Sequence, residues 1–255
     1  MKQFIITPSA GKRLIAKALA ADDSVLNGLK FGTVVIVAGT TNGYVAEELL
    51  KIIGVSDSFP KKRFFRGITL SPEQTVTSEG RLFDESEFLG DVVITHNVWQ
   101  KGKTIFDVVD DLKEGDIIIK GANAVDLQRK QAALLIGHPK AGTIGVALQA
   151  VVGRRVKLII AAGLEKRVSE DLCCLAEKVN IPGAGGYRLL PIPGQVFTEI
   201  EAIRLLTGTT AEIMAGGGVC GAEGSCRLAI SGTKAQEDAA QKLLTSIVAE
   251  PLFSL

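Results

Sequence analysis

TVVIVAGTTNGY, at positions 33–44, joins an apolar β-branched run to a glycine-rich turn, and a helical pattern follows over 44–53. A buried strand that leads through such a turn into a helix is typical of a parallel sheet covered by helices. Free backbone N–H groups at a helix start attract anions. The turn Gly39-Thr40-Thr41-Asn42-Gly43 is therefore a predicted ligand-binding segment, although a tight turn with a threonine cap would use the same residues.

Three further apolar runs repeat this pattern, and each ends in a loop of small or polar residues. They are DVVIT at 91–95, DIIIK at 116–120 and VKLIIA at 156–161. Together they predict an α/β fold with a mostly parallel, doubly wound (Rossmann-like) sheet. Ligands of such sheets bind beyond the carboxyl ends of the strands, so the loops after these runs are the segments to read for function. The polar segment 59–87, basic at its start, is expected to be an excursion over the sheet edge.

A change of pattern follows the Pro/Gly cluster IPGAGG at 181–186, which is a predicted linker. We expect an α/β ligand-binding domain over 1–185 and a smaller ferredoxin-like α+β domain over 186–255. The expected order of the second domain is βαββα, with strands at 187–192, 211–215 and 225–231 and helices at 195–206 and 234–249.

Composition excludes several classes of protein. The chain has 255 residues, 46% hydrophobic content and a formal net charge of +1, which predicts a folded core and no general attraction to nucleic acid or an anionic membrane. No apolar run reaches the roughly 20 residues that span a bilayer, and the start has no signal-peptide pattern, so a cytoplasmic location is expected. Cys220 and Cys226 lack the paired spacing of a zinc site. We predict neither a metal site nor a cofactor.

Candidate site residues follow the apolar runs. Lys120, Asn123 and Asp126 place a cation, an amide and a carboxylate after one strand. The segment PKAGTIG at 139–145 offers a second helix start, and His96 and His138 lie in loops where either histidine is able to shuttle protons. The predicted ligand-binding residues beyond the first turn are Asn123, Lys140, Gly142, Thr143 and Lys166.

The order of these motifs resembles the superfamily that includes ribose-5-phosphate isomerase type A, glucosamine-6-phosphate isomerase, the CoA transferases and the sugar-phosphate-responsive repressors. The resemblance is carried by GTTN after the first strand, DIIIKGANAVD in the middle, then VKLIIAAGLEKRV and RLLPIP. It implies that Thr40, Thr41 and Lys166 face a ligand phosphate.

The departures from the pentose isomerase concern its acids. Its middle motif reads Asp-Gly-Ala-Asp-Glu-Val-Asp, but here Lys120 and Asn123 replace the first two acids and only Asp126 keeps its identity. The family's glutamate base would fall within 142–153, which contains no acidic residue. Because proton transfer between carbons needs a base of suitable pKa, we expect no ribose-5-phosphate isomerase activity.

Three functional hypotheses stay open at this point. The first is a protein that binds or senses a small phosphorylated or anionic metabolite of the sugar phosphate class. The second is an isomerase, hydrolase or CoA/acyl transferase of the same superfamily, with Lys120, Asp126 and His138 as catalytic candidates and Glu165 as a weak candidate nucleophile. The third is an interaction protein whose basic stretch at 59–66 contacts a partner. A homo-oligomer is expected in each case.

Overall fold

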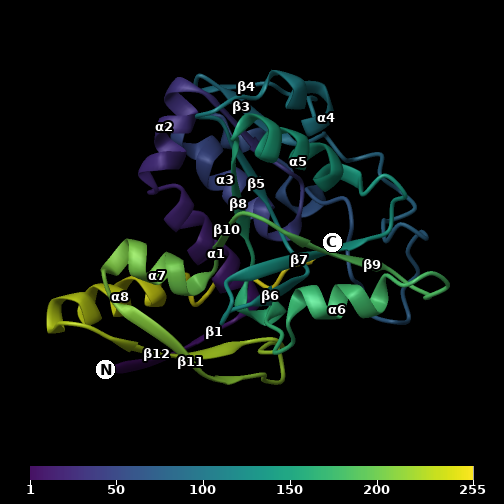
Figure 1. Cartoon of the computed structure of the whole chain (residues 1–255). Helices are drawn as coiled ribbons and strands as arrows, with labels where there is room; N and C mark the ends of the chain where they lie inside the picture. The colour runs from purple at the N-terminus through teal and green to yellow at the C-terminus, as the bar shows by residue number, and fades with distance from the viewer. Residues whose placement is uncertain (255) are drawn as a thin grey trace.

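The computed structural model describes residues 1–254 and has an α/β fold around a six-stranded sheet (Figure 1). In spatial order its strands are β10 (Gln195–Phe197), β8 (Lys157–Ala161), β5 (Ile117–Lys120), β2 (Thr33–Ile36), β3 (Val92–Thr95) and β4 (Val98–Trp99). The first four are mutually parallel, whereas β3 is antiparallel to β2 and β4 is antiparallel to β3. The sheet therefore mixes parallel and antiparallel strands. β2, β3, β5 and β8 lie where the apolar runs predicted them, whereas β4 was not expected and β10 lies where a helix was expected.

Both faces of this sheet are covered, which explains why its strands are continuous apolar runs. Val34 and Ile36 of β2 pack in a core with the first three helices, while Val35 packs in a separate core on the other face. The helices of the first core are α1 (Pro8–Leu19), α2 (Asp23–Phe31) and α3 (Thr40–Ile52); those of the second are α4 (Ile105–Val108) and α5 (Gly142–Arg154).

The strand order reverses between β2 and β5. From β2 the chain passes to β3 and β4 on one side, and then returns to the other side of β2 with β5, β8 and β10. Ile36 pairs with Ile119, so the residues that follow β2 and β5 leave the same edge of the sheet. The connections that follow two such strands diverge, and a crevice opens between them at that edge.

A second, antiparallel sheet contains β6 (Ala124–Asp126), β7 (Gln131–Ile136) and β9 (Arg188–Ile192), with α6 (Leu172–Val179) packed beside it. The strand expected at 187–192 is present as β9, but its expected place in a C-terminal ferredoxin-like sheet is wrong, because it pairs with β7. Leu189 packs with Leu172 and Ala133 in a small core under this sheet. A strand pattern alone does not specify which partner buries it.

The third sheet has the order β1 (Lys2–Ile6), β12 (Cys226–Ser231) and β11 (Thr210–Gly216), all antiparallel, and it runs along the bottom of Figure 1 with α7 (Glu199–Thr207) and α8 (Lys234–Ile247) above it. The N-terminal strand thus takes the place that was expected for 187–192. The helix expected from 195 begins at Glu199, because Thr198 and Glu201 form a capping box there.

Strand pairing crosses the boundary expected between 185 and 186. β10 pairs with β8 and β9 with β7, while β1 pairs with β12.

Residues 59–87 are mostly irregular, with the 3-10 helix η2 (Lys61–Arg63) near their start. The other 3-10 helices are η1 (Ser56–Ser58), η3 (Val109–Asp111) and η4 (Leu164–Lys166). None of the helices described over 1–254 is both long and apolar enough to cross a membrane.

Candidate functional site

The predicted glycine-rich turn is the first turn of α3. Gly39 is the N-cap residue, and Thr40 opens the helix directly after β2. The first N–H groups of a helix have no acceptor within it, and no side chain caps this helix start. Gly43 N–H is already used, since it donates to Gly39 O at 2.8 Å. The segment therefore presents the N–H groups of its first residues to whatever lies beyond the sheet edge.

Thr41 and Asn42 have opposite roles in this turn. Thr41 is 2% exposed and is one of the residues that line the cavity described below, and its buried Oγ1 has no hydrogen-bond partner. Asn42 is fully buried and donates from Nδ2 to Val37 O at 2.7 Å and Ile119 O at 3.1 Å. The prediction that Asn42 binds the ligand is therefore corrected, because its amide fastens β2 to β5. Gly43 likewise faces Lys61 and not the cavity.

The second helix start, at α5, lies next to the end of β5. Ala141 and Gly142 adopt the left-handed conformation and lead into the helix, and no side chain caps this helix start either. Lys120 Nζ donates to Thr143 Oγ1 at 2.9 Å. Lys120 is only 8% exposed, and burial lowers its pKa to about 8, with Asp91 opposing and Arg66 reinforcing that shift.

The excursion at 59–87 contributes a wall that sequence reasoning did not place at the site. Arg66 Nη2 donates to the buried carboxylate of Asp91 at 2.8 Å, while its Nε is buried without a partner. Gly67 and Arg81 form a bridge, so both arms of this hairpin-like loop reach the cavity. The absence of a β-carbon at Gly137 allows the backbone of Glu79 to approach closely. The basic stretch expected to contact a partner thus directs Arg66 at the site.

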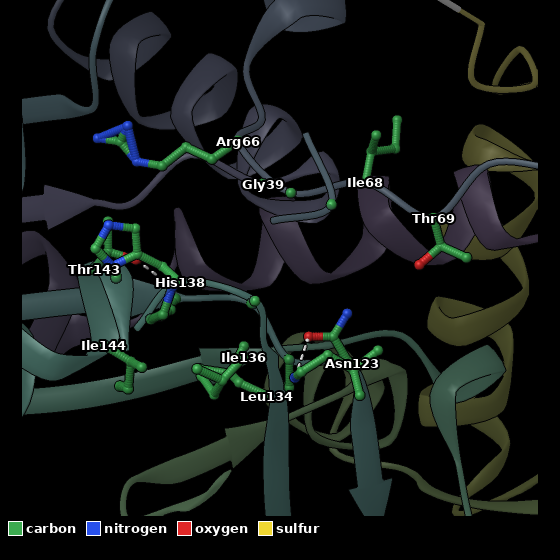
Figure 2. A pocket seen from close by; sticks show the side chains of 18 of the residues that line it. Gly39, Arg66, Ile68, Thr69, Asn123, Leu134, Ile136, His138, Thr143 and Ile144 are labelled. Carbon is green, nitrogen blue, oxygen red and sulfur yellow. Dashed lines mark hydrogen bonds between the residues drawn. The ribbon is translucent and has the colours of Figure 1, made fainter. Parts of the chain in front are cut away.

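These segments enclose a cavity of about 340 Å³, within the range of small-molecule sites. Figure 2 shows Arg66, Ile68 and Thr69 on one wall and Asn123, His138 and Thr143 on the opposite wall. Four lining side chains are Arg or Lys, and among the lining residues, all in the described chain, Glu79 is the single acid. The lining is formed by 38–41, 66–69, 79–81, 120–123, 134–138 and 141–144, with Lys166 and Tyr187.

Three further predicted residues reach this cavity. Lys166 donates to Ala122 O at 2.8 Å, and burial lowers its pKa despite the nearby Glu165 carboxylate. His138 Nδ1 accepts from the Lys140 N–H at 3.1 Å, and its Nε2 lies 3.9 Å from Glu79 Oε1. Asn123 Oδ1 accepts from Leu135 N–H at 3.0 Å, which leaves its amide nitrogen pointing toward the opposite wall (Figure 2).

Besides Asn42 and Gly43, two further residues of the predicted site, Asp126 and Lys140, do not line the cavity. Asp126 is buried in β6, where its carboxylate accepts from Gln128 N–H, Arg129 N–H and Arg129 Nη1. Its predicted catalytic role is therefore corrected, because these bonds stabilise the turn between β6 and β7. Lys140 is exposed outside the lining residues, and only its backbone contacts His138.

The arrangement is suited to binding anions, because two uncapped helix starts and an excess of cations border one cavity. The groups within it that are able to move protons include Lys120, His138 and Glu79, and Lys166 and Tyr187 also line it. Glu79 and Arg66 were not identified from the sequence because they lie in a segment without strand or helix periodicity. No protein-family model, curated protein or solved structure matches this chain.

Proposed function

We propose that this cavity binds a small phosphorylated or otherwise anionic metabolite of the sugar phosphate class. The observation that carries the proposal is the start of α3, where the N–H groups lack a cap and the buried Thr41 Oγ1 lacks a partner. A buried hydroxyl without a partner costs about 1–3 kcal/mol, and because Thr41 lines the cavity, a ligand within hydrogen-bond reach of this hydroxyl would remove that cost. A phosphate oxygen accepts from both the hydroxyl and the N–H groups.

The other lining groups support a ligand with a phosphate and hydroxyls. Arg66, Lys120 and Lys166 attract negative charge at a site sheltered from solvent, where such attraction is screened less than in water. The amide nitrogen of Asn123 is able to donate to a hydroxyl group. Leu134 and Ile136 add apolar surface against which a carbon skeleton packs.

We also propose that the chain belongs to the superfamily that includes ribose-5-phosphate isomerase type A. We propose that it binds its ligand without ribose-5-phosphate isomerase activity. GTTN lies at a helix start without a side-chain cap, and this position supports the resemblance. The family's acids are missing from α5, and Asp126 is tied to Arg129. Incubation with ribose 5-phosphate is expected to form no ribulose 5-phosphate, and its formation at an enzymatic rate would disprove this part.

An enzyme acting on a phosphorylated or CoA-linked substrate is the second candidate. One observation favours it: a lysine with a pKa near 8 shares the cavity with His138 and Glu79. Lys120 would stabilise an oxyanion or enolate, while His138 or Glu79 moves the proton. Product formation that is lost in a Glu79→Gln, His138→Gln double variant would favour this candidate.

Ligand binding is tested by thermal unfolding of the full chain with sugar phosphates, nucleotides, CoA esters and inorganic phosphate. A sugar phosphate at 100 times its Kd is expected to raise the Tm by about 5–10 °C. Thr41→Val replaces only the hydroxyl with a methyl group, and it is expected to reduce the shift by half or more without lowering the Tm of the free protein. Gly39→Leu fills the cavity, since a β-carbon at Gly39 meets no atom within 4 Å and its extended backbone accepts any residue.

Lys140→Ala is the matched control, because Lys140 is exposed next to the site and outside its lining. This variant is expected to keep the full shift. The proposal is wrong if no phosphorylated compound raises the Tm, or if Thr41→Val and Gly39→Leu respond like the Lys140 control.

A cytoplasmic homo-oligomer completes the proposal. The exposed apolar residues Ile5 on β1 and Val248 at the end of α8 border a groove that a second copy would cover. Light scattering on the eluting peak of a size-exclusion column gives the mass, and a single-chain mass of 26.9 kDa at all concentrations would contradict it.

A further inference from the structure

Lys120 is a buried cation without a counter-ion. The only hydrogen bond of its Nζ in the described chain is the one donated to Thr143 Oγ1, and within residues 1–254 the ammonium group forms no ion pair at 4 Å or less. An ammonium group has three donors, so two are left for other partners. A buried charge with neither solvent nor a partner is costly, and this one is located at a cavity wall.

The nearest acid does not compensate it. Asp91 carries the opposing charge that acts on Lys120, but its two oxygens accept from Arg66 Nη2, Ala38 N–H and Ile105 N–H. Arg66 adds a second positive charge to the same neighbourhood and keeps its Nε without a partner. The Asp91 carboxylate therefore balances one of the two cations, and a net positive charge is left at the cavity.

This charge lies at a different place from the start of α3. Thr41 belongs to the helix after β2, whereas Lys120 ends β5 and bonds to the first turn of α5. β2 and β5 are neighbours, and neighbouring strands are about 4.8 Å apart. The cavity thus borders two helix starts without side-chain caps, each beside a buried polar group with unused hydrogen-bonding capacity.

We propose that the ligand carries two anionic groups, a phosphate at the start of α3 and a second phosphate or a carboxylate at the start of α5 against Lys120 and Thr143. This inference rests on the proposed binding function and adds the class of ligand. A sugar bisphosphate and a phosphorylated sugar acid have this chemistry, whereas a simple sugar phosphate leaves Lys120 uncompensated. A second anion would accept hydrogen bonds from the two remaining N–H donors of the Lys120 ammonium group.

Calorimetric titration of the full chain with three six-carbon probes tests the inference. The probes are glucose 6-phosphate, glucose 1,6-bisphosphate and 6-phosphogluconate. One or both of the doubly anionic probes are expected to bind about tenfold more tightly or better, which corresponds to a gain of about 1.4 kcal/mol. Their ranking distinguishes a phosphate from a carboxylate at the second position.

Two variants separate the positions. Lys120→Met is expected to weaken the doubly anionic probes about tenfold more than glucose 6-phosphate, whereas Thr41→Val is expected to weaken all three probes by a similar factor. Equal affinities for the three probes, or an advantage that survives in Lys120→Met, would overturn the inference and leave the proposed function standing. Binding of none of the three probes would overturn the inference, and the thermal-unfolding screen would then decide the proposed function separately.

The pH dependence of the wild-type protein gives a check that does not depend on a variant. The second anion binds the protonated Lys120, which loses its proton as the pH rises through about 8 in the free protein. The advantage of the doubly anionic probe is therefore expected to fall above pH 8, by up to about tenfold per pH unit. An advantage that is constant from pH 6.5 to 9.5 would contradict the role of Lys120.

Discussion

Arg13 and Lys120 are both buried cations, but the protein gives them very different partners. Arg13 on α1 pairs with Glu47 at 2.5 Å, with Glu250 at 2.9 Å and also with Glu48. Lys120 donates to a hydroxyl and pairs with no carboxylate within residues 1–254. The first cation is neutralised within the fold, whereas the second is at the wall of a cavity.

The pKa values of the two groups record this difference. Burial alone lowers the pKa of Arg13, but hydrogen bonds to Glu250 and Glu47 raise it above its ordinary value. For Lys120 burial dominates and its pKa falls to about 8. A buried cation that is surrounded by acids stabilises the fold, whereas one without acids stabilises it only when a ligand supplies the charge.

The largest effect is expected from breaking the compensated cluster. Arg13→Met leaves three glutamates with reduced compensation, and the free energy of unfolding is expected to fall by about 3–5 kcal/mol in urea denaturation. Lys51→Met is the matched control, because Lys51 contacts the same Glu47 and Glu48 but is half exposed. Its loss is expected to stay below about 1 kcal/mol. A similar, small loss in both variants would show that Arg13 is not needed for stability.

Lys120→Met is expected to raise the free energy of unfolding, in contrast to Arg13→Met. It removes an uncompensated buried charge, so the free energy of unfolding of the ligand-free protein is expected to rise by about 1–3 kcal/mol at pH 7. The folded-state pKa of Lys120, about 8, lies below its ordinary value of 10.5. The destabilisation by Lys120 is therefore fully present below pH 8 and disappears as the pH rises toward 10.5. Thermal unfolding from pH 6 to 10 checks this, and a variant that is less stable than wild type at pH 7 would refute it.

Much of the site was predictable because strand and helix periodicity reports local burial. The runs at 33–37 and 116–120 form β2 and β5, and a helix starts at 142 as expected. These elements meet at one sheet edge, and for that reason Lys120 and Thr143 both reach the cavity. Residues that end strands of one sheet are brought together by the fold class itself.

The rest depends on contacts that are distant in sequence. Arg66 is in an irregular segment, and contacts with residues distant in sequence, such as its ion pair with Asp91, hold it at the cavity. The pairing of β1 with β12 joins the two ends of the chain, which no local pattern encodes. Asn42 was placed correctly in the turn, but its side chain points into the protein, where it fastens two strands.

Asp126→Asn gives the smallest expected effect and sharpens the comparison between buried charges. Its carboxylate, like Arg13, is satisfied within the fold by two backbone N–H groups and Arg129. The amide keeps one acceptor oxygen but loses the ion pair, so unfolding is expected to become easier by about 1 kcal/mol. Ligand-induced Tm shifts are expected to equal those of wild type, whereas Lys120→Met loses the advantage of a second anion. Loss of ligand binding in Asp126→Asn would return this carboxylate to the site, and it would show that compensation within the fold does not distinguish structural charges from functional ones.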